Sequence, residues 1–475
     1  MNTPTLTQKK RATRRGPLRA AFRSLLYPPD SADTPILAAA PAYFEDLRLD
    51  AIVRAITAGR HDYNLEPFFW TRLTDLAGVE YRQQVFRDLE RKPIRAALAA
   101  FAKAMASVRA CLDHARRSHH GWERARWHLD GASVYCRAVS QLEADLRAQV
   151  PVSQGMTELA EFLARYVASG AFEQLADETQ SVTTTLAELR YRLRIKGDRV
   201  IVSRHREEPD YGAEVLQTFA KFQQDEGTAY EFEFASRVEL NHVETAVLDL
   251  VAQLHRPEFD ALAGFVERHP DFADPILTRL DREAGFYLAY LDHLDRLARP
   301  GLSFCIPEVV DRPDHVYGRD VFDLALARSL TDEHTPLVPN DFELTDPERI
   351  LVISGPNQGG KTTFARTVGQ LHHLAALGVP VPGSTVRLEL VDHVFAHFER
   401  VEEVEDMAGK LEDELRRMRD ILEQATGRSL LVMNESFSST TLTDQLLISK
   451  WILGTVIERR TLAVVVTFLD ELLMA

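Results

Sequence analysis

The stretch Gly355-Pro-Asn-Gln-Gly-Gly-Lys-Thr-Thr363 decides how the C-terminal part of this chain is expected to fold. It follows an apolar run at 349–354, which predicts a buried strand, and it precedes 364–377, which predicts a helix. Strand, glycine-rich loop, Lys-Thr and helix together are the context in which G-x-x-x-x-G-K-[ST] is a phosphate-binding loop. The sequence therefore predicts an α/β nucleotide-binding domain built on this loop.

The chemistry of the loop follows from its residue types. Backbone N–H groups of the loop and of the helix N-terminus converge on one point, which favours an anion there. Gly359 and Gly360 let the backbone approach the phosphates without a Cβ in the way. Lys361 is expected to reach the β- and γ-phosphates, and Thr362 to ligate Mg²⁺. The alternative, a glycine-rich turn beside an ordinary surface lysine, is disfavoured by the flanking strand and helix.

Length and composition indicate an ordinary globular protein. The 475 residues are 27% charged and 45% hydrophobic, which suggests roughly two to four domains. The chain has no apolar run long enough for a membrane span and no long apolar stretch of a secretory signal. Its three distant cysteines, Cys111, Cys136 and Cys305, are typical of a reducing cytosol and exclude a disulfide framework or a Cys-based zinc site. We therefore expect a cytoplasmic protein without a membrane partner.

The net charge of −15 excludes a protein that coats nucleic acid through a general positive charge. Any contact with nucleic acid must come from local basic patches. Residues 1–34 contain one such patch, six lysines and arginines between positions 9 and 19, followed by a Pro/Ser/Asp stretch. Such an arm can hold phosphates, but a solvated, disordered tail is the interpretation that we favour.

Residues 35–330 are expected to be mainly α-helical, because apolar residues recur there at steps of three and four. The stripes are Ile94, Leu98, Phe101, Met105, Val108 and Leu112; Leu240, Val243, Val247, Leu250 and Leu254; and Leu277, Leu280, Ala284, Tyr287, Leu291 and Leu294. Long amphipathic helices of this kind pack as a bundle or as lever-like arms. The histidine pairs at 119–120 and 372–373 are interpreted as structural or surface residues, because adjacent residues do not share one helical face.

A basic segment at about 180–210 interrupts the helical pattern. Residues 190–206 alternate with period two around a Lys-Gly-Asp turn, which predicts a β-hairpin with a charge of +6. The candidate DNA-contacting residues are Arg190, Arg192, Arg194, Lys196 and Arg199. Alternation places the first four on one face, opposite Tyr191, Leu193 and Ile195. This row of cations is either a grip on phosphates or a solvated, charge-protected edge, and the pattern leaves both open.

Residues 331–475 are expected to form the nucleotide domain. Beyond the loop, apolar runs at 386–398, 429–433 and 462–467 predict further strands. An acidic residue at the carboxyl end of a buried strand lies beside the phosphate loop in an open α/β sheet. Glu435 is therefore our candidate for polarising the water that attacks the nucleotide.

These motifs resemble those of the MutS mismatch-repair ATPases. The Pro-Asn and double Gly of 355–362 are similar to the family's Walker A, and Arg428-Ser-Leu-Leu-Val-Met-Asn-Glu435 resembles its Walker B. Shorter similarities, at 339–341, 379–380 and 438–441, extend the resemblance over roughly residues 335–470. Upstream, helical arms with an inserted hairpin resemble the family's core, lever and clamp regions in architecture only.

The resemblance implies an ABC-type P-loop ATPase domain at the C-terminus, preceded by a mainly α-helical core and lever domain with an inserted β-hairpin. It implies a homodimer, formed through the ATPase domains, that embraces DNA and couples nucleotide state to its grip. Lys361 and Glu435 would be catalytic, and Thr362 and Asn434 would hold Mg²⁺. ATP would be bound by Gly355, Pro356, Asn357, Gln358, Gly359, Gly360, Lys361, Thr362 and Thr363.

Two residues and one segment depart from the family pattern. The segment is the trans-acting Ser region, which is Ala408-Gly409-Lys410 here and lacks that Ser. Asn434 stands where the family usually has Asp, and an amide lacks the carboxylate's charge, so Mg²⁺ ordering should weaken. Phe468 stands where the family has a switch histidine. We therefore expect a weak Mg²⁺-dependent ATPase that still binds nucleotide. No N-terminal Phe-x-Glu of a mismatch-reading domain is recognisable, so branched DNA is as good a candidate as mismatched DNA.

Several functions compete at this point. The first is an ATP-dependent DNA-binding protein of DNA mismatch repair or recombination. The second is an ATP-gated clamp or scaffold with negligible hydrolysis that engages a protein partner, which Asn434 and Phe468 favour. A transporter or chromosome-maintenance ATPase is disfavoured because no Leu-Ser-Gly-Gly precedes the second strand. A small-molecule kinase is disfavoured because no acceptor-site motif is recognisable.

Overall fold

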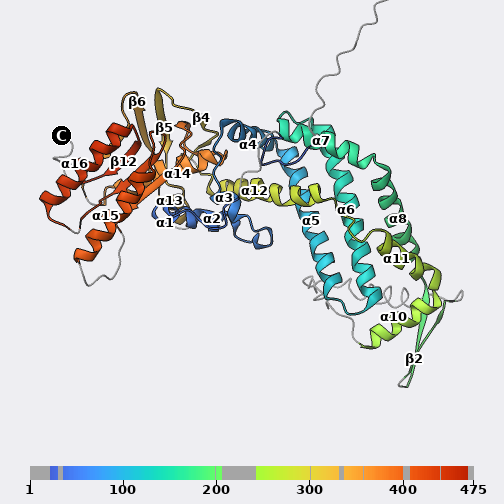
Figure 1. Cartoon of the computed structure of the whole chain (residues 1–475). Coiled ribbons are helices and arrows are strands. Elements are labelled where there is room, and N and C mark those ends of the chain that lie inside the picture. The colour runs from blue at the N-terminus through green and yellow to red at the C-terminus, as the bar shows by residue number, and fades with distance from the viewer. Residues whose placement is uncertain are drawn as a thin grey trace, which may run out of the picture. The chain divides into compact units, whose positions relative to one another are not determined.

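The computed structural model describes residues 22–29, 36–197, 199–205, 242–299, 301–330, 336–356, 358–399, 407–438 and 440–468. The chain divides into two units, and each is described by itself (Figure 1). Unit 1 comprises residues 1–88, 152–162 and 289–475, and unit 2 comprises residues 89–151 and 163–288. The domain boundaries expected after residues 34 and 330 stay predictions. No helix in the described ranges is long and apolar enough to cross a membrane.

Unit 1 contains two four-stranded sheets and one two-stranded sheet. Its strands are β3 (Phe304–Cys305), β4 (Glu308–Val310), β5 (His315–Val321), β6 (Asn340–Thr345), β7 (Ile350–Ile353), β8 (Val381–Pro382), β9 (Thr385–Glu389), β10 (Val394–Phe398), β11 (Leu430–Asn434) and β12 (Leu462–Val466). Its helices are α1 (Tyr43–Asp46), α2 (Leu49–Thr57), a 3-10 helix (His61–Tyr63), α3 (Glu66–Trp70), α4 (Leu76–Leu89), α13 (Leu324–Ser329), α14 (Lys361–Ala376), α15 (Met407–Gln424) and α16 (Leu442–Arg459). Three helices contain residues of both units: α4, through its last residue Leu89, α7 (Gln154–Val167) and α12 (Pro275–Leu297).

One sheet is parallel throughout, with the strand order β10-β11-β12-β7. Every residue of β11 and β12 is buried, as expected of parallel strands that are covered on both faces. On one face, Leu431 and Met433 of β11 join a cluster with residues of α15 and α16. Strand alternation leaves the opposite face to α14, which contacts the same strands. The predicted α/β region with a parallel sheet is confirmed.

The second four-stranded sheet is mixed, with the order β4-β9-β5-β6. Strand β4 runs parallel to β9, whereas β5 runs antiparallel to both β9 and β6. A register shift interrupts the β5–β6 pairing between Gly318 and Val321. This sheet joins strands from both sides of residue 330, because β4 and β5 precede that residue and β6 and β9 follow it.

The end of the predicted N-terminal tail is packed into unit 1. Phe22, Leu25 and Leu26 are buried. The hydroxyl of Tyr81 donates to the carbonyl of Ser24 at 2.8 Å, and nearby side chains of α4 hold the same segment. Residues of this segment therefore pack against α4, while the basic positions 9–19 lie outside the described residues.

Helix α14, which follows the phosphate loop, is anchored to the N-terminal helices by three side chains of one face. Arg366 donates from Nε to the carbonyl of Asp46, Gln370 from Nε2 to Leu47, and His373 bonds the carbonyl of Phe69, each at 2.9 Å. Residues 366, 370 and 373 share a face because they are spaced by four and three positions. The start of the chain thereby fixes the helix that carries the candidate site.

Unit 2 is a helical assembly with a β-hairpin, as predicted. Its elements are α5 (Lys92–Arg117), α6 (Gly121–Gln149), α8 (Gly170–Ala187), β1 (Tyr191–Lys196), β2 (Arg199–Arg204), α10 (His242–Leu254) and α11 (Arg256–Arg268). Helices α5 and α6 pack along each other, α8 and α11 pack against α6, and α10 lies beside β2 (Figure 1).

The buried helix faces agree with two of the three predicted stripes. Ile94, Leu98 and Phe101 of α5 are buried, and so is the predicted stripe of α12 from Leu277 to Leu294. Helix α10 differs. Its Val243 and Leu250 are exposed, although the pattern placed them in the core, and the neighbouring 251–252 positions are buried instead.

Candidate nucleotide site

The phosphate loop connects β7 to α14, and its turns need left-handed backbone. Gly355 has φ 145° and Gly360 has φ 81°, values that favour glycine. Gln358 adopts φ 64° without being glycine, which is a costly conformation that occurs mostly at functional sites. A Cβ on Gly359 would lie 3.0 Å from a loop carbonyl, so the loop is closed tightly here. Asn357, another predicted nucleotide contact of this turn, lies outside the described residues.

Lys361 is the first residue of α14, and its side chain lies against the loop. Its Nζ donates to the carbonyl of Gly355 at 2.7 Å and to that of Pro356 at 3.0 Å. The same nitrogen lies 3.9 Å from the ring centroid of Phe468, and the lysine is only 8% exposed. The ammonium group is thus held at the N-terminus of a helix, where an anion is favoured.

Thr362 of α14 contacts Asn434 at the carboxyl end of β11. Asn434 is the last residue of β11, is 9% exposed, and accepts a hydrogen bond from Thr362 Oγ1 through its Oδ1 at 2.8 Å. These are the two residues predicted at the metal, and the fold brings them together from positions 72 residues apart. Their roles stay predictions.

The donor set of this corner fits Mg²⁺. Within the described ranges, no group of three His, Cys, Asp or Glu side chains could hold a metal ion. Mg²⁺ does not need such a cage, because it is usually bound by one or two protein oxygens and by the phosphates of its substrate. The Thr362 hydroxyl and the Asn434 carbonyl oxygen supply oxygens of this kind, and neither carries a charge.

Glu435 follows directly at the carboxyl edge of the sheet. Its backbone is left-handed, with φ 49°, and its N–H donates to the carbonyl of Val466 at 3.1 Å. A non-glycine residue keeps such a conformation only when its surroundings over-determine it. The bond to β12 is one of these restraints, so the half-buried Glu435 is presented at the strand end where we expect an attacking water.

The turn after Glu435 is fixed by residues that the sequence analysis missed. His397 of β10 is buried, and its Nδ1 lies 2.8 Å from the hydroxyl of Ser436. Gln445 of α16 donates to the carbonyl of Ser436 at 3.0 Å. The His397 ring stacks on Phe437, 5.3 Å away, and Phe437 is itself left-handed at φ 64°. The sequence offered only a weak signal, because His397 is one of two histidines in the run 386–398.

The comparison with known families agrees with this geometry. Residues 351–474 match the family model of MutS domain V. This part of the chain belongs to the MutS domain V family. MutS domain V is an ABC-type ATPase domain.

A curated relative is similar to this chain over a stretch of comparable length. The Endonuclease MutS2 of Thermus thermophilus is 35% identical over 141 residues, which are 29% of this chain and 19% of that protein. The chain therefore matches about a fifth of the length of this relative.

Outside the MutS domain V, the hairpin of unit 2 carries the other predicted contacts. Lys196 pairs with Arg199 across the turn, and cross-strand pairs share a face, so both lie with Arg192 and Arg194. All but the half-buried Arg192 are exposed. Arg190 instead precedes β1 and donates to carbonyls at the end of α8, at 3.1 and 3.2 Å. The opposite hairpin face borders an apolar hollow of about 830 Å³.

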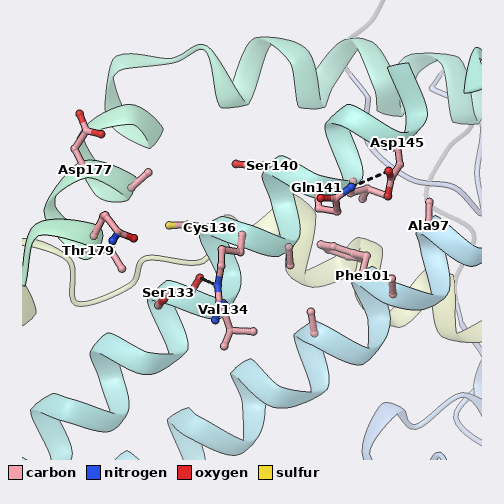
Figure 2. A pocket seen from close by; sticks show the side chains of 17 residues that line it. Ala97, Phe101, Ser133, Val134, Cys136, Ser140, Gln141, Asp145, Asp177 and Thr179 are labelled. Carbon is pink, nitrogen blue, oxygen red and sulfur yellow. Dashed lines mark hydrogen bonds between the residues drawn. The ribbon is translucent and has the colours of Figure 1, made fainter. Parts of the chain in front are cut away.

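A second hollow of unit 2, about 780 Å³, lies among α5, α6 and α8 (Figure 2). Figure 2 shows Ser133, Cys136, Ser140 and Thr179 among its lining residues. Burial raises the pKa of the Cys136 thiol to about 11, so the thiol stays protonated at neutral pH and is a poor nucleophile. Cys136 is therefore not a candidate nucleophile in this hollow.

Proposed function

We propose that this protein is an ATP-dependent DNA-binding protein of the MutS type, acting in DNA mismatch repair or recombination. One observation carries the proposal: Thr362 donates to Asn434 at 2.8 Å beside a loop that encloses Lys361. This arrangement places a Walker A hydroxyl against a Walker B oxygen, inside a domain of the MutS domain V family. The protein would bind mismatched or branched DNA and couple nucleotide state to its grip.

In this proposal the phosphates of ATP bind the loop N–H groups and the Lys361 ammonium. Thr362 and Asn434 would hold Mg²⁺, which neutralises phosphate charge when it is bound. Glu435 would orient and polarise the attacking water. Because Asn434 is neutral, it orders the cation less strongly than a carboxylate, and we propose a weak ATPase.

The DNA contact is proposed at the basic face of the hairpin. Arg194, Lys196 and Arg199 lie exposed on one face of a hairpin within an otherwise acidic chain. Reversing all three to Glu should weaken DNA binding and lower the slope of log affinity against log salt by about 3, since each lost phosphate contact removes about 0.9.

The matched control reverses three exposed arginines of unit 1, Arg54, Arg416 and Arg419, and so changes the net charge equally. A salt slope that falls equally in both variants would show a general charge effect. A slope that stays unchanged in the hairpin variant would remove the hairpin from the interface.

We also propose a homodimer formed through the ATPase domains. Helix α16 exposes Leu447 and Trp451, which are 69% and 64% exposed and lie four residues apart on one face. Large apolar side chains that lie together on a surface mark interaction sites. Trp451→Glu should shift the protein to a monomer in sedimentation; a dimer of unchanged stability would exclude this face.

The second candidate is an ATP-gated clamp or scaffold that hydrolyses ATP negligibly and engages a protein partner. It is favoured by Asn434, which has no charge, and by Phe468, whose ring lies on the P-loop lysine. The two candidates agree on nucleotide binding and differ in turnover.

The test is ATP hydrolysis by the full chain, alone and with homoduplex, mismatched and four-way DNA, with Lys361→Ala as the blank. DNA-dependent turnover that the blank lacks supports the first candidate, and the most stimulating DNA names the substrate class. Binding without turnover favours the clamp or scaffold. Equal turnover in the blank would refute both, because the activity would not come from this loop.

A further inference from the structure

The ammonium group of Lys361 interacts with three groups of the protein itself, two carbonyls and one aromatic ring. Two loop carbonyls, of Gly355 and Pro356, accept hydrogen bonds from Nζ at 2.7 and 3.0 Å. The ring face of Phe468 covers another side, with its centroid 3.9 Å from Nζ. A cation within about 6 Å of a ring centroid is attracted by the ring's quadrupole. The lysine that should bind phosphate therefore already has partners.

The position of Phe468 over the loop is set by the sheet. Strand β12 lies beside β7, and the N–H of Thr467 donates to the carbonyl of Ile353 at 3.1 Å. Ile353 is the last residue of β7, which leads into the phosphate loop. Phe468, which follows Thr467, therefore lies beside this loop. Phe468 is 47% exposed, which shows that its ring is not held there by burial in a core.

We propose that Phe468 is a gate on the phosphate loop. Its ring holds the Lys361 ammonium against the loop carbonyls. The phosphates of a nucleotide must displace the ring before they can contact this lysine. Phe468 thereby lowers the nucleotide affinity of the site. The inference rests on the proposed binding of nucleotide and adds a residue that opposes it.

The size of the effect follows from the one contact that a substitution removes. The hydrogen bonds of Lys361 to its own loop are common to all variants, so they cancel in a comparison. Loss of the ring contact alone corresponds to about two- to thirty-fold in affinity. Phe468→Leu keeps the apolar bulk and removes the quadrupole, so it separates cation attraction from simple obstruction.

The experiment measures Mg²⁺–ATP affinity of the full chain by titration calorimetry. Phe468→Ala and Phe468→Leu should both bind ATP about two- to thirty-fold more tightly than the natural chain. Weaker binding by Phe468→Ala would overturn the gate, because the ring would then contribute to holding the nucleotide. Equal affinity in all three proteins would overturn it as well.

A double substitution tests that the ring acts through the lysine. In a Lys361→Ala background, Phe468→Ala should leave the remaining affinity for ATP unchanged, because the cation that the ring holds is gone. A gain as large as in the natural background would refute the coupling and assign the effect to another contact of the ring.

A measurement without nucleotide separates this inference from the proposed function. Amine acylation followed by mass spectrometry should label Lys361 faster in Phe468→Ala than in the natural chain, with exposed Lys450 as the internal control. Equal labelling of Lys361 would refute the gate even if ATP binds. If Lys361 is labelled faster in Phe468→Ala but neither this variant nor the natural chain binds ATP, the contact between Phe468 and Lys361 stands. The proposed nucleotide-binding function is then refuted.

Discussion

Acidification from pH 7.5 to pH 5 should destabilise unit 1 through two buried histidines of the P-loop helix. His373 lies between Tyr43 and Phe69: its Nε2 is 2.9 Å from the Phe69 carbonyl, and its Nδ1 is 3.1 Å from the Tyr43 hydroxyl. His372 Nδ1 lies 2.9 Å from the carbonyl of Val368. A carbonyl oxygen can only accept a hydrogen bond, so each of these contacts fixes an N–H on the ring nitrogen that faces it.

Burial lowers the pKa of His372 to about 4 and that of His373 to about 3, from the ordinary 6.5. Between these values and pH 6.5, the unfolded chain binds more protons than the folded one. The contribution of these two histidines to the free energy of unfolding is therefore constant above pH 6.5 and falls as the pH falls below it. At pH 5 each histidine lowers it by about 2 kcal/mol, about 4 kcal/mol for the pair, which is a large share of a typical total of about 5–15 kcal/mol.

The assay is urea unfolding at pH 7.5, 6.0 and 5.0. His373→Gln should reduce the pH-dependent loss by about 2 kcal/mol, whatever it does to stability at pH 7.5. Burial also lowers the pKa of His293 of unit 1 to about 4, so this histidine adds a similar loss to both proteins. His119→Gln is the control, because His119 is exposed and should leave the pH dependence unchanged. A free energy of unfolding that is the same at pH 7.5 and pH 5, or a loss that His373→Gln does not reduce, would refute the reasoning.

Other substitutions test the site and its support. Asn434→Asp should raise Mg²⁺-dependent ATP hydrolysis by about tenfold or more, since it restores a carboxylate at the cation; an unchanged rate in a Mg²⁺ titration contradicts this. His397→Ala should cost about 2–4 kcal/mol in urea unfolding, because a buried ring and its serine contact are lost. Gly369→Ala should cost about 1–3 kcal/mol, because its Cβ would lie 2.7 Å from Leu47, whereas Gly454→Ala, with nothing within 4 Å, should stabilise by about 0.5–1 kcal/mol.

The strand, loop and helix around 350–376 could be predicted from the sequence because the constraint is local. A glycine-rich turn between an apolar run and a helix has one common geometry, and β7 and α14 begin and end close to the expected positions. Asn434 at the end of β11 was predictable for a similar reason, since buried parallel strands expose their carboxyl-end residues at one edge of the sheet.

Packing choices were not predictable from periodicity. The run 386–398 was expected as one strand, but it forms β9 and β10, which lie in different sheets. Both halves are apolar, and composition does not indicate which partner each will pair with. Likewise, α10 turns Val251 inward and Val243 outward, because its buried face is set by packing against β2 and α11.

The contacts that support the site join distant parts of the chain. His397 reaches Ser436, and Phe468 reaches Lys361, through neighbouring strands of the parallel sheet. No local pattern contains both members of either pair. The sequence showed Phe468 as a departure from a family pattern, but its contact with the lysine required the strand order.

The most direct test of the central claim is calorimetric titration of the full chain with ATP and Mg²⁺, repeated with Lys361→Ala. The account predicts one ATP per chain, bound by the natural protein and weakened by more than about tenfold when the charge-assisted contacts of the lysine are lost. Equal affinity in both proteins, or no binding by the natural chain, would contradict the assignment of this loop as a nucleotide site.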